Sequence, residues 1–434
     1  MGNLFLSFLG TSEYLPCNYV YKEKKAKDVQ FVQEGLLSIL LDKFSSGKEN
    51  RVVIFLTDAA REKNWETRND DEGLYQRLLK IERNLKIEAV RIPEGNSEKG
   101  IWEIFKIVFD QIHDEDGIYL DVTHGFRSLP MLAMVLLNYA RFLKGIKVKG
   151  IYYGAFESLG AYQVVKNLNL EERNVPIFDL TPFHTLQRWS GAVENFEVFG
   201  DTQTISSLLF SKLNQIIKST DKPDKKAFDE KDFAKGFGKV GNLYSTVRGK
   251  QLYKGDEHNR LKQQIEKVSQ QKLYNYPLSP LLNRVQEQLS PYKMNSLRNC
   301  FLGVGWCLEH GYIQQGITLL QETIISAILD DIGEDWSDES GTEVKIIEKR
   351  RLALSGFIKR WNKDGVILGE EREAEYFSVD ANTLKEKLQM SAVFEHMAPI
   401  YEGLRDHRNN INHAGYLLDI KAGDFSNRLR KAYK

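Results

Sequence analysis

Short apolar runs alternate with helically spaced apolar residues along the first 156 residues. The apolar runs predict β-strands at residues 4–9, 51–57, 87–92, 117–122 and 148–153. Apolar residues three and four positions apart predict intervening helices at residues 31–40, 74–81, 101–108 and 129–143. This alternation favours right-handed βαβ units and a mostly parallel sheet. The last of these helices is apolar on nearly every face, so we expect it to be buried.

Strand signals fade after Pro182, and the rest of the chain is predicted to be helical. Residues 217–235 carry dense charge of both signs, which predicts a solvated, mobile insertion. The glycine pattern at 236–241 matches GxGxxG but follows no strand, so we interpret it as a flexible loop. Further helices are predicted at residues 183–216, 297–310, 312–332, 344–361 and 393–412. The fold class is therefore α/β plus all-α, with an α/β domain at 1–178, a helical linker and insertion at 179–290, and a helical domain at 291–434.

Composition narrows the class of protein. A chain of 434 residues is longer than one domain with a single hydrophobic core usually is. Its content of 42% apolar and 28% charged residues is typical of soluble globular domains. Sixty basic and sixty acidic residues cancel, which disfavours a duplex-DNA binder that relies on a broad basic field. The three cysteines lack metal-ligand spacing, so we expect no metal site. No signal peptide or membrane-spanning run is present in the pattern, and we expect a cytoplasmic protein.

The turn after the fourth predicted strand is the first candidate site. Parallel sheets bind ligands beyond the carboxyl ends of their strands, and a helix N-terminus there favours an anion. Arg127 offers a forked donor to a phosphate, and Gly125 permits close backbone approach. An ordinary strand–helix connection capped by Ser128 explains the same residues. The candidate ligand-binding residues, including the first-strand turn on the same edge, are Thr11, Ser12, Thr123, His124, Gly125, Arg127 and Ser128.

The second candidate site ends the helix predicted at 393–412. At about 100° per residue, Asn409 and His413 share one face, and Arg408 and Asn412 share another. Asparagines have low helix propensity, yet three of them lie at this helix end. Residues that oppose the local secondary structure often mark a functional site. An Arg and a His can provide charge stabilisation and proton transfer for RNA cleavage without a metal. A polar helix C-terminus stopped by Gly415 accounts for the same pattern.

Together the two motifs resemble the CRISPR-associated ribonucleases that join a CARF sensor domain to a HEPN nuclease domain. DVTHGFRSLP, followed by an apolar helix and IYYGA, is similar to the signature segment of one CARF branch. RNNINH is similar to the R-x4-H motif of HEPN ribonucleases. The resemblance covers most of the chain, apart from about residues 215–295.

The resemblance implies a fold and a mechanism. A Rossmann-like CARF dimer would bind cyclic oligoadenylate made by a type III CRISPR complex. Binding would activate paired helical HEPN domains, which cut single-stranded RNA without metal and leave a 2′,3′-cyclic phosphate. Arg408 and His413 match the catalytic pair, and Asn409 matches the polar position beside the Arg. The turn at 123–128 matches the ligand-binding turn, and Thr11 and Ser12 match its first-strand counterpart less specifically.

The resemblance also implies partners and leaves alternatives open. We expect a homodimer or higher homo-oligomer, no cofactor, and cyclic tetra-adenylate as activator, with cyclic hexa-adenylate as the main rival. One alternative is a non-catalytic ligand-controlled regulator, although no helix-turn-helix signature is evident. Another is a ring nuclease that degrades cyclic oligoadenylate, in which His124 would take part. An ordinary dinucleotide enzyme is disfavoured, because the first turn, GTSEY, lacks the glycine fingerprint.

Overall fold

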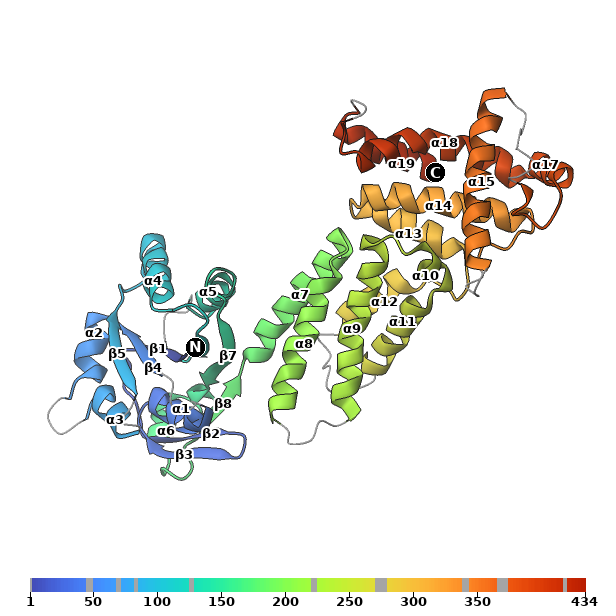
Figure 1. Cartoon of the computed structure of the whole chain (residues 1–434). Coiled ribbons are helices and arrows are strands. Elements are labelled where there is room, and N and C mark those ends of the chain that lie inside the picture. Colours follow the sequence, from blue (N-terminus) through green and yellow to red (C-terminus); the bar gives the residue numbers. More distant parts are fainter. Residues whose placement is uncertain are drawn as a thin grey trace. The chain divides into compact units, whose positions relative to one another are not determined.

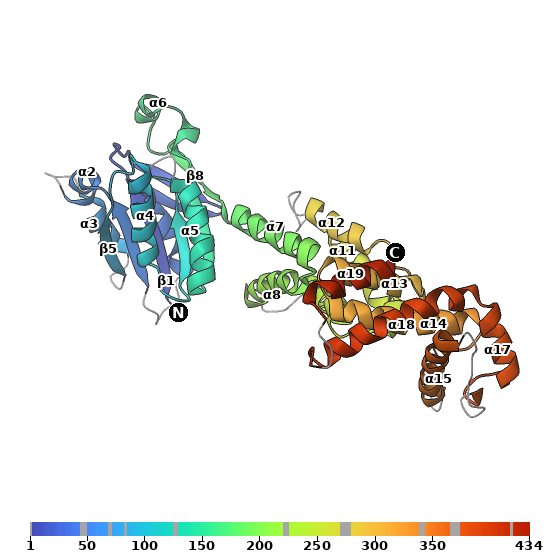
Figure 2. The same ribbon diagram turned by 90° about the horizontal axis from the view of Figure 1, so that it is seen from above.

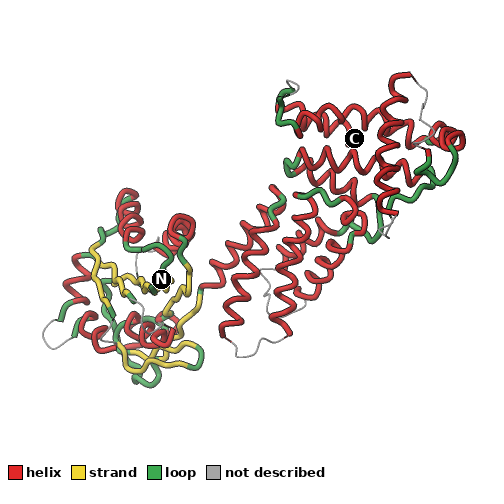
Figure 3. The backbone as a smooth tube through the Cα atoms, viewed as in Figure 1, coloured by secondary structure: helices red, strands yellow, loops and turns green. Residues whose placement is uncertain are grey.

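The computed structural model describes most of the chain and forms two compact units. The units are Met1–Thr185 and Leu186–Lys434, and the boundary falls within one helix. Among the described residues, strands occur only in the N-terminal unit (Figure 3). No helix in this described part is long and apolar enough to cross a membrane. The described residues are 2–43, 50–67, 72–81, 85–124, 129–219, 225–269, 279–337, 343–364, 374–416 and 420–434.

The N-terminal unit is built on one eight-stranded sheet of order β3-β2-β8-β7-β6-β1-β4-β5. The five strands from β7 to β5 run parallel, as predicted, and β8 pairs antiparallel with β7. The β2–β3 hairpin was not predicted, because β3 reads KKAKDV and buries only Ala26 and Val29. The strands are β1 (Asn3–Leu9), β2 (Cys17–Tyr21), β3 (Lys24–Val29), β4 (Arg51–Leu56), β5 (Lys86–Arg91), β6 (Gly117–Asp121), β7 (Lys147–Gly154) and β8 (Asn174–Asp179).

Helices cover both faces of this sheet (Figures 1 and 2). Successive β1 side chains enter opposite cores, so Phe5 packs on one side while Leu4 and Leu6 pack on the other. The result is a three-layer, Rossmann-like α/β fold. Helices α1 (Val32–Leu40) and α3 (Leu74–Ile81) contribute to the first core, and α4 (Glu98–Asp110) and α5 (Leu129–Lys144) contribute to the second.

Helix α5 corrects one expectation. Leu136 and Leu137 are buried against the sheet, but Met131 and Phe142 are 78% and 84% exposed. The prediction of burial on every side was wrong, because a helix lying on a sheet covers only one of its faces. The apolar residues on its other face are left open to solvent in the single chain.

The C-terminal unit is helical and has one hydrophobic core. That core runs from Trp189 on α7 to Leu429 on α19, and α14 packs against both α13 and α18. Side chains from both sides of position 290 contribute to it. The helices are α7 (Thr181–Phe199), α8 (Thr202–Ser219), α9 (Lys225–Ser245), α10 (Gly249–Lys254), α11 (Asp256–Ser269), α12 (Ser279–Leu289), α13 (Arg298–Glu309), α14 (Ile313–Asp331), α15 (Glu343–Asp364), α17 (Ala381–Met390), α18 (Ala392–Asn412) and α19 (Ala422–Tyr433).

Helix α9 corrects two further expectations. The charged insertion and the glycine-rich loop are largely one helix, in which Phe233 and Phe237 are fully buried. A Cβ atom at Gly241 would lie 2.0 Å from the Thr202 hydroxyl oxygen, so only glycine allows this approach of α9 to α8. The glycine pattern therefore serves helix packing, while the described charged residues Lys231, Asp232 and Lys235 are exposed. Residues 220–224 of the predicted insertion lie outside the described residues.

Candidate functional site

A hollow of about 270 Å³ lies at the carboxyl ends of β1, β4, β5 and β6. This is the edge where parallel sheets bind ligands. It brings Thr11 and Ser12 together with Thr123 and His124, although the two pairs are more than one hundred positions apart in the sequence. The other predicted ligand-binding residues, Gly125, Arg127 and Ser128, lie outside the described residues. The complete lining is Phe8, Leu9, Gly10, Thr11, Ser12, Thr57, Ile92, Glu94, Thr123 and His124.

Asp121 holds the turn that carries Thr123 and His124. It is fully buried at the end of β6, and its Oδ2 accepts a hydrogen bond from the Ser7 hydroxyl at 2.7 Å. Its Oδ1 accepts from the Thr123 N–H at 2.9 Å and from the Thr123 hydroxyl at 2.6 Å. Burial raises the pKa of Asp121, and these hydrogen bonds oppose the rise. The Thr123 hydroxyl also accepts from the Gly154 N–H at 2.8 Å, so Thr123 positions the turn.

Two residues without a recognisable motif hold the Thr11–Ser12 loop. Asn64 Nδ2 donates to the carbonyl oxygens of Gly10 at 2.8 Å and Ser12 at 3.0 Å. The Gly10 N–H donates to the Tyr14 hydroxyl at 3.0 Å, and the Tyr14 ring meets the His124 ring edge-on at 4.8 Å. The first-strand turn and the β6 turn are therefore fixed relative to each other before any ligand binds.

His124 is neutral in this hollow at pH 7. Burial lowers its pKa to about 4, and the charge of Glu157 opposes the shift only in part. Its imidazole can donate or accept a hydrogen bond but adds no positive charge. No described residue of the lining is a Lys or Arg. Glu94 contributes the one carboxylate of the described lining, and hydroxyl, backbone and imidazole groups provide its other polar contacts.

A second hollow, of about 420 Å³ and open to solvent, contains the predicted arginine of the C-terminal motif. Arg408 and Asn412 on α18 both line it, as their helical spacing predicts. Asn409 and His413 are exposed, and neither belongs to its lining. The remaining lining comes from the last residue of α9, the two residues after it, and α14, namely Ser245, Thr246, Val247, Gln314, Gln315, Thr318 and Glu322.

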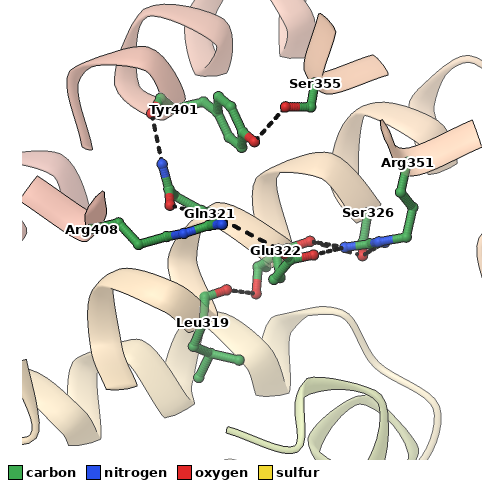
Figure 4. Close-up of polar contacts among 9 residues, drawn as sticks. Leu319, Gln321, Glu322, Ser326, Arg351, Ser355, Tyr401 and Arg408 are labelled. Carbon is green, nitrogen blue, oxygen red and sulfur yellow. Dashed lines mark hydrogen bonds and ion pairs between the residues drawn. The ribbon is translucent and has the colours of Figure 1, made fainter. Parts of the chain in front are cut away.

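Helix α14 fixes the Arg408 guanidinium beside this hollow (Figure 4). Arg408 Nη1 donates to Gln321 Oε1 at 3.4 Å and lies 3.9 Å from Glu322 Oε1. Gln321 is fully buried, and its Nε2 donates to the Tyr401 carbonyl oxygen at 3.1 Å. Because both amide atoms of Gln321 are engaged, its oxygen stays directed toward Arg408.

His413 ends helix α18. Its N–H donates to the Asn409 carbonyl oxygen at 2.9 Å, and the Gly415 N–H donates to the Asn410 carbonyl oxygen at 2.9 Å. Ala414 and Gly415 have φ of +52° and +78°, the left-handed turn that commonly ends a helix. The geometry is thus that of a capped C-terminus, and it leaves the imidazole in solvent.

Comparisons with known proteins cover the first of these sites. Residues 4–157 match the family model described as the CARF domain of the CRISPR system endoribonuclease Csx1. The N-terminal unit is a CARF domain. The chain is 33% identical over 134 residues to the CRISPR-associated protein MJ1674 of Methanocaldococcus jannaschii, which covers 30% of this chain and 20% of that protein. The chain therefore spans about a fifth of the length of that curated relative.

Among solved structures, the chain is similar to Csm6 of Enterococcus italicus bound to cyclic hexa-2′-fluoro-hexa-dAMP. That similarity has a TM-score of 0.42 and 12% identity, and it covers all of this chain and 92% of that one. The family match ends at residue 157, so the CARF domain contains the first hollow, and Arg408 lies beyond the matched region.

The sequence did not reveal the residues that hold either site. Tyr14 and Asn64 support the CARF loop, while Gln321 and Glu322 contact Arg408. Only Gln321 left a signal in the sequence: it lies at helical spacing from the apolar residues Ile317, Ile324 and Ile328, and a polar side chain on an apolar helix face indicates a buried polar contact. Among the residues with described positions, no group of three or more His, Cys, Asp or Glu is placed to hold a metal ion.

Proposed function

We propose that this protein is a CRISPR type III accessory endoribonuclease. Its CARF domain binds cyclic oligoadenylate, with the tetra-adenylate ring favoured, and a HEPN-type domain within 291–434 then cuts single-stranded RNA without a metal. The observation that carries the proposal is the fixed Arg408 guanidinium at an open polar hollow, in a chain that begins with a CARF domain.

The CARF hollow suits a ring of phosphates and adenines. Thr11, Ser12 and the neutral His124 offer hydrogen bonds, while Glu94 is the one charged side chain of the described lining. Arg127, three residues after His124 in the sequence, would add the positive charge that a phosphate needs. A ring without a free end is matched best by two copies of one site around a two-fold axis.

An exposed apolar surface supports a homodimer of this kind. The outer face of α5 exposes Met131, Val135 and Phe142 at 78%, 59% and 84%. The surface continues onto α4, because the Phe105 ring lies 5.6 Å from Tyr139 and 5.8 Å from Trp102. Large exposed apolar patches mark association surfaces, and a second copy of the same face would bury both.

The chemistry requires few groups. The ribose 2′-oxygen forms a bond to phosphorus while the bond from phosphorus to the 5′-oxygen breaks, giving a 2′,3′-cyclic phosphate and a 5′-hydroxyl. His413 assists the proton transfers at these oxygens, Arg408 stabilises negative charge on the phosphate, and Asn409 provides a polar contact beside Arg408. A dimer places two such sets around one phosphate, so one His can accept a proton while the other donates one.

The end chemistry of the products tests this proposal. Single-stranded RNA is incubated with cyclic tetra-adenylate in EDTA, and the fragment ends are identified by mass. Wild type should leave 2′,3′-cyclic phosphates, Arg408→Ala and His413→Ala should lose cleavage, and the exposed-site control Lys421→Ala should retain it. Fragments with 3′-hydroxyl ends, or full cleavage by both variants, would contradict the proposed mechanism.

A further inference from the structure

A third hollow lies in the C-terminal unit on the other side of Glu322 from Arg408. It measures about 270 Å³ and shares Val247 and Glu322 with the Arg408 hollow, so the two are contiguous. We name it the Trp336 pocket. Its lining is Val247, Gly249, Lys250, Cys300, Leu319, Glu322, Thr323, Ser326, Trp336, Ile347 and Arg351.

We propose that the Trp336 pocket binds one nucleotide of the single-stranded RNA whose neighbouring phosphate lies at Arg408. The inference rests on the proposed ribonuclease function and adds a substrate subsite to it. The base would stack on Trp336, and Arg351 and Lys250 would contact the adjoining phosphate.

Two contacts hold the Trp336 ring in place. The Trp336 indole N–H donates to Asp330 Oδ1 at 3.1 Å, and the ring meets Tyr253 edge-on at 4.7 Å. Leu319 and Ile347 add an apolar lining. Base–aromatic stacking tolerates any base, because every base has a π-face. A preset indole beside apolar walls is therefore a stacking platform that loses little entropy on binding.

The charges of the pocket favour an anion. Lys250 and Arg351 are its two cations and Glu322 is its one carboxylate. Arg351 Nη2 lies 2.7 Å from Glu322 Oε2, and Arg351 Nη1 donates to the Ser326 hydroxyl at 2.8 Å. Those contacts hold the guanidinium in place (Figure 4). Its Nε–H makes no hydrogen bond among the residues that the structure describes, so a donor remains for a phosphate.

Glu322 connects the pocket to the cleavage site. One of its carboxylate oxygens contacts Arg351 and the other lies 3.9 Å from Arg408 Nη1. A strand that places a phosphate at Arg408 therefore lies next to the Trp336 pocket, and adjacent nucleotides can occupy both hollows. A single strand has its bases free to enter such a pocket, whereas a duplex keeps them stacked.

The test measures binding and cleavage separately. Binding uses a fluorescent 2′-O-methyl RNA oligonucleotide, which cannot be cut because it lacks a free 2′-hydroxyl. Trp336→Ala should weaken binding by roughly 5- to 150-fold, the range for losing one stacked base. Trp336→Phe should keep most of the affinity, because it keeps an aromatic face. Arg351→Met should weaken binding, whereas Lys359→Ala, an exposed cation on the same helix, should not.

Cleavage kinetics separate failure of the subsite from failure of the proposed function. In an active enzyme, Trp336→Ala should raise KM for RNA while the affinity for cyclic tetra-adenylate stays unchanged. Equal RNA affinity of wild type, Trp336→Ala and Arg351→Met, with normal melting temperatures, would overturn the subsite whether or not the RNA is cut. Absence of cleavage by wild type with any ring would instead overturn the ribonuclease assignment.

Discussion

Gln321 holds Arg408 through one hydrogen bond from the Arg408 guanidinium to a fully buried amide oxygen, 3.4 Å away. Gln321 is fixed in turn by Tyr401, whose hydroxyl bonds to the Ser355 hydroxyl oxygen at 2.8 Å. A chain of three helices, α14, α18 and α15, therefore determines where the guanidinium points. Its orientation is a property of the folded unit, and it can be perturbed without touching the substrate.

Replacing Gln321 by Leu should release Arg408 while preserving side-chain volume. Because misplacing a catalytic group by about 1 Å costs on the order of 100-fold in rate, we expect ring-activated RNA cleavage to fall about 10- to 100-fold. Single-turnover cleavage rates at saturating cyclic tetra-adenylate measure this. Gln314→Leu is the matched control, because Gln314 lines the same hollow and, among the described contacts, makes no hydrogen bond to Arg408. Equal losses in both variants would refute the positioning role.

Asp121→Ala should damage the CARF domain locally. The Ser7 hydroxyl and the Thr123 N–H would each lose a buried acceptor, which costs about 1–3 kcal/mol per group. We expect a lower melting temperature and a lower affinity for cyclic tetra-adenylate, measured by thermal unfolding and calorimetric titration. The exposed Asp114→Asn serves as control, and unchanged ring affinity in Asp121→Ala would show that the β6 turn does not form the binding site.

Binding of the ring should be insensitive to His124 protonation near neutral pH. Burial lowers the pKa of His124 to about 4, so the imidazole is neutral throughout pH 6–8. The affinity for cyclic tetra-adenylate should therefore show no step near pH 6.5 that depends on His124. Wild type and His124→Gln should have the same pH dependence in this range. A calorimetric titration series across this range measures it, and such a step would mean that a charged imidazole contacts the phosphates.

Acid should destabilise the protein through a buried histidine of the C-terminal unit. His258 is fully buried against the Tyr244 hydroxyl, and burial lowers its pKa to about 3, helped by the charge of Lys262. Between pH 6.5 and 3 the unfolded chain binds a proton that the folded chain does not, so stability falls as pH falls. The contribution approaches about 1.4 kcal/mol per pH unit. Urea unfolding at pH 7 and pH 5 should show a smaller loss for His258→Gln than for wild type. An equal loss in both would exclude His258 as the source.

Charging the outer face of α5 should separate the protomers. Phe142→Glu would place a carboxylate in the proposed apolar contact between two copies, where it would lose its hydration. We expect a monomer by analytical ultracentrifugation, together with weakened activation by the ring. Lys80→Glu on α3, which packs on the opposite face of the sheet, should remain dimeric. A dimeric Phe142→Glu protein would place the interface elsewhere.

Patterns local in sequence were predictable, and contacts across the chain were not. The five parallel strands could be predicted from apolar runs such as RVVIFL, because such runs occur in buried strands or helices. Helix α9 was not predicted, because its two buried phenylalanines are surrounded in the sequence by charged residues. The close approach of α8 that its glycines allow is evident only in the three-dimensional structure. Thr11 and His124 were predicted on one edge because strand topology determines it, whereas Gln321 needed the packing of α14 on α18.

The most direct test of the central claim is the rate of single-stranded RNA cleavage in EDTA as cyclic tetra-adenylate is titrated, with cyclic hexa-adenylate alongside. Wild type should show little cutting without a ring and saturable activation by tetra-adenylate, and His413→Ala should stay inactive while binding the ring normally. Tight ring binding by wild type without RNA cleavage would contradict the account and favour a ligand-controlled regulator or a ring-degrading enzyme.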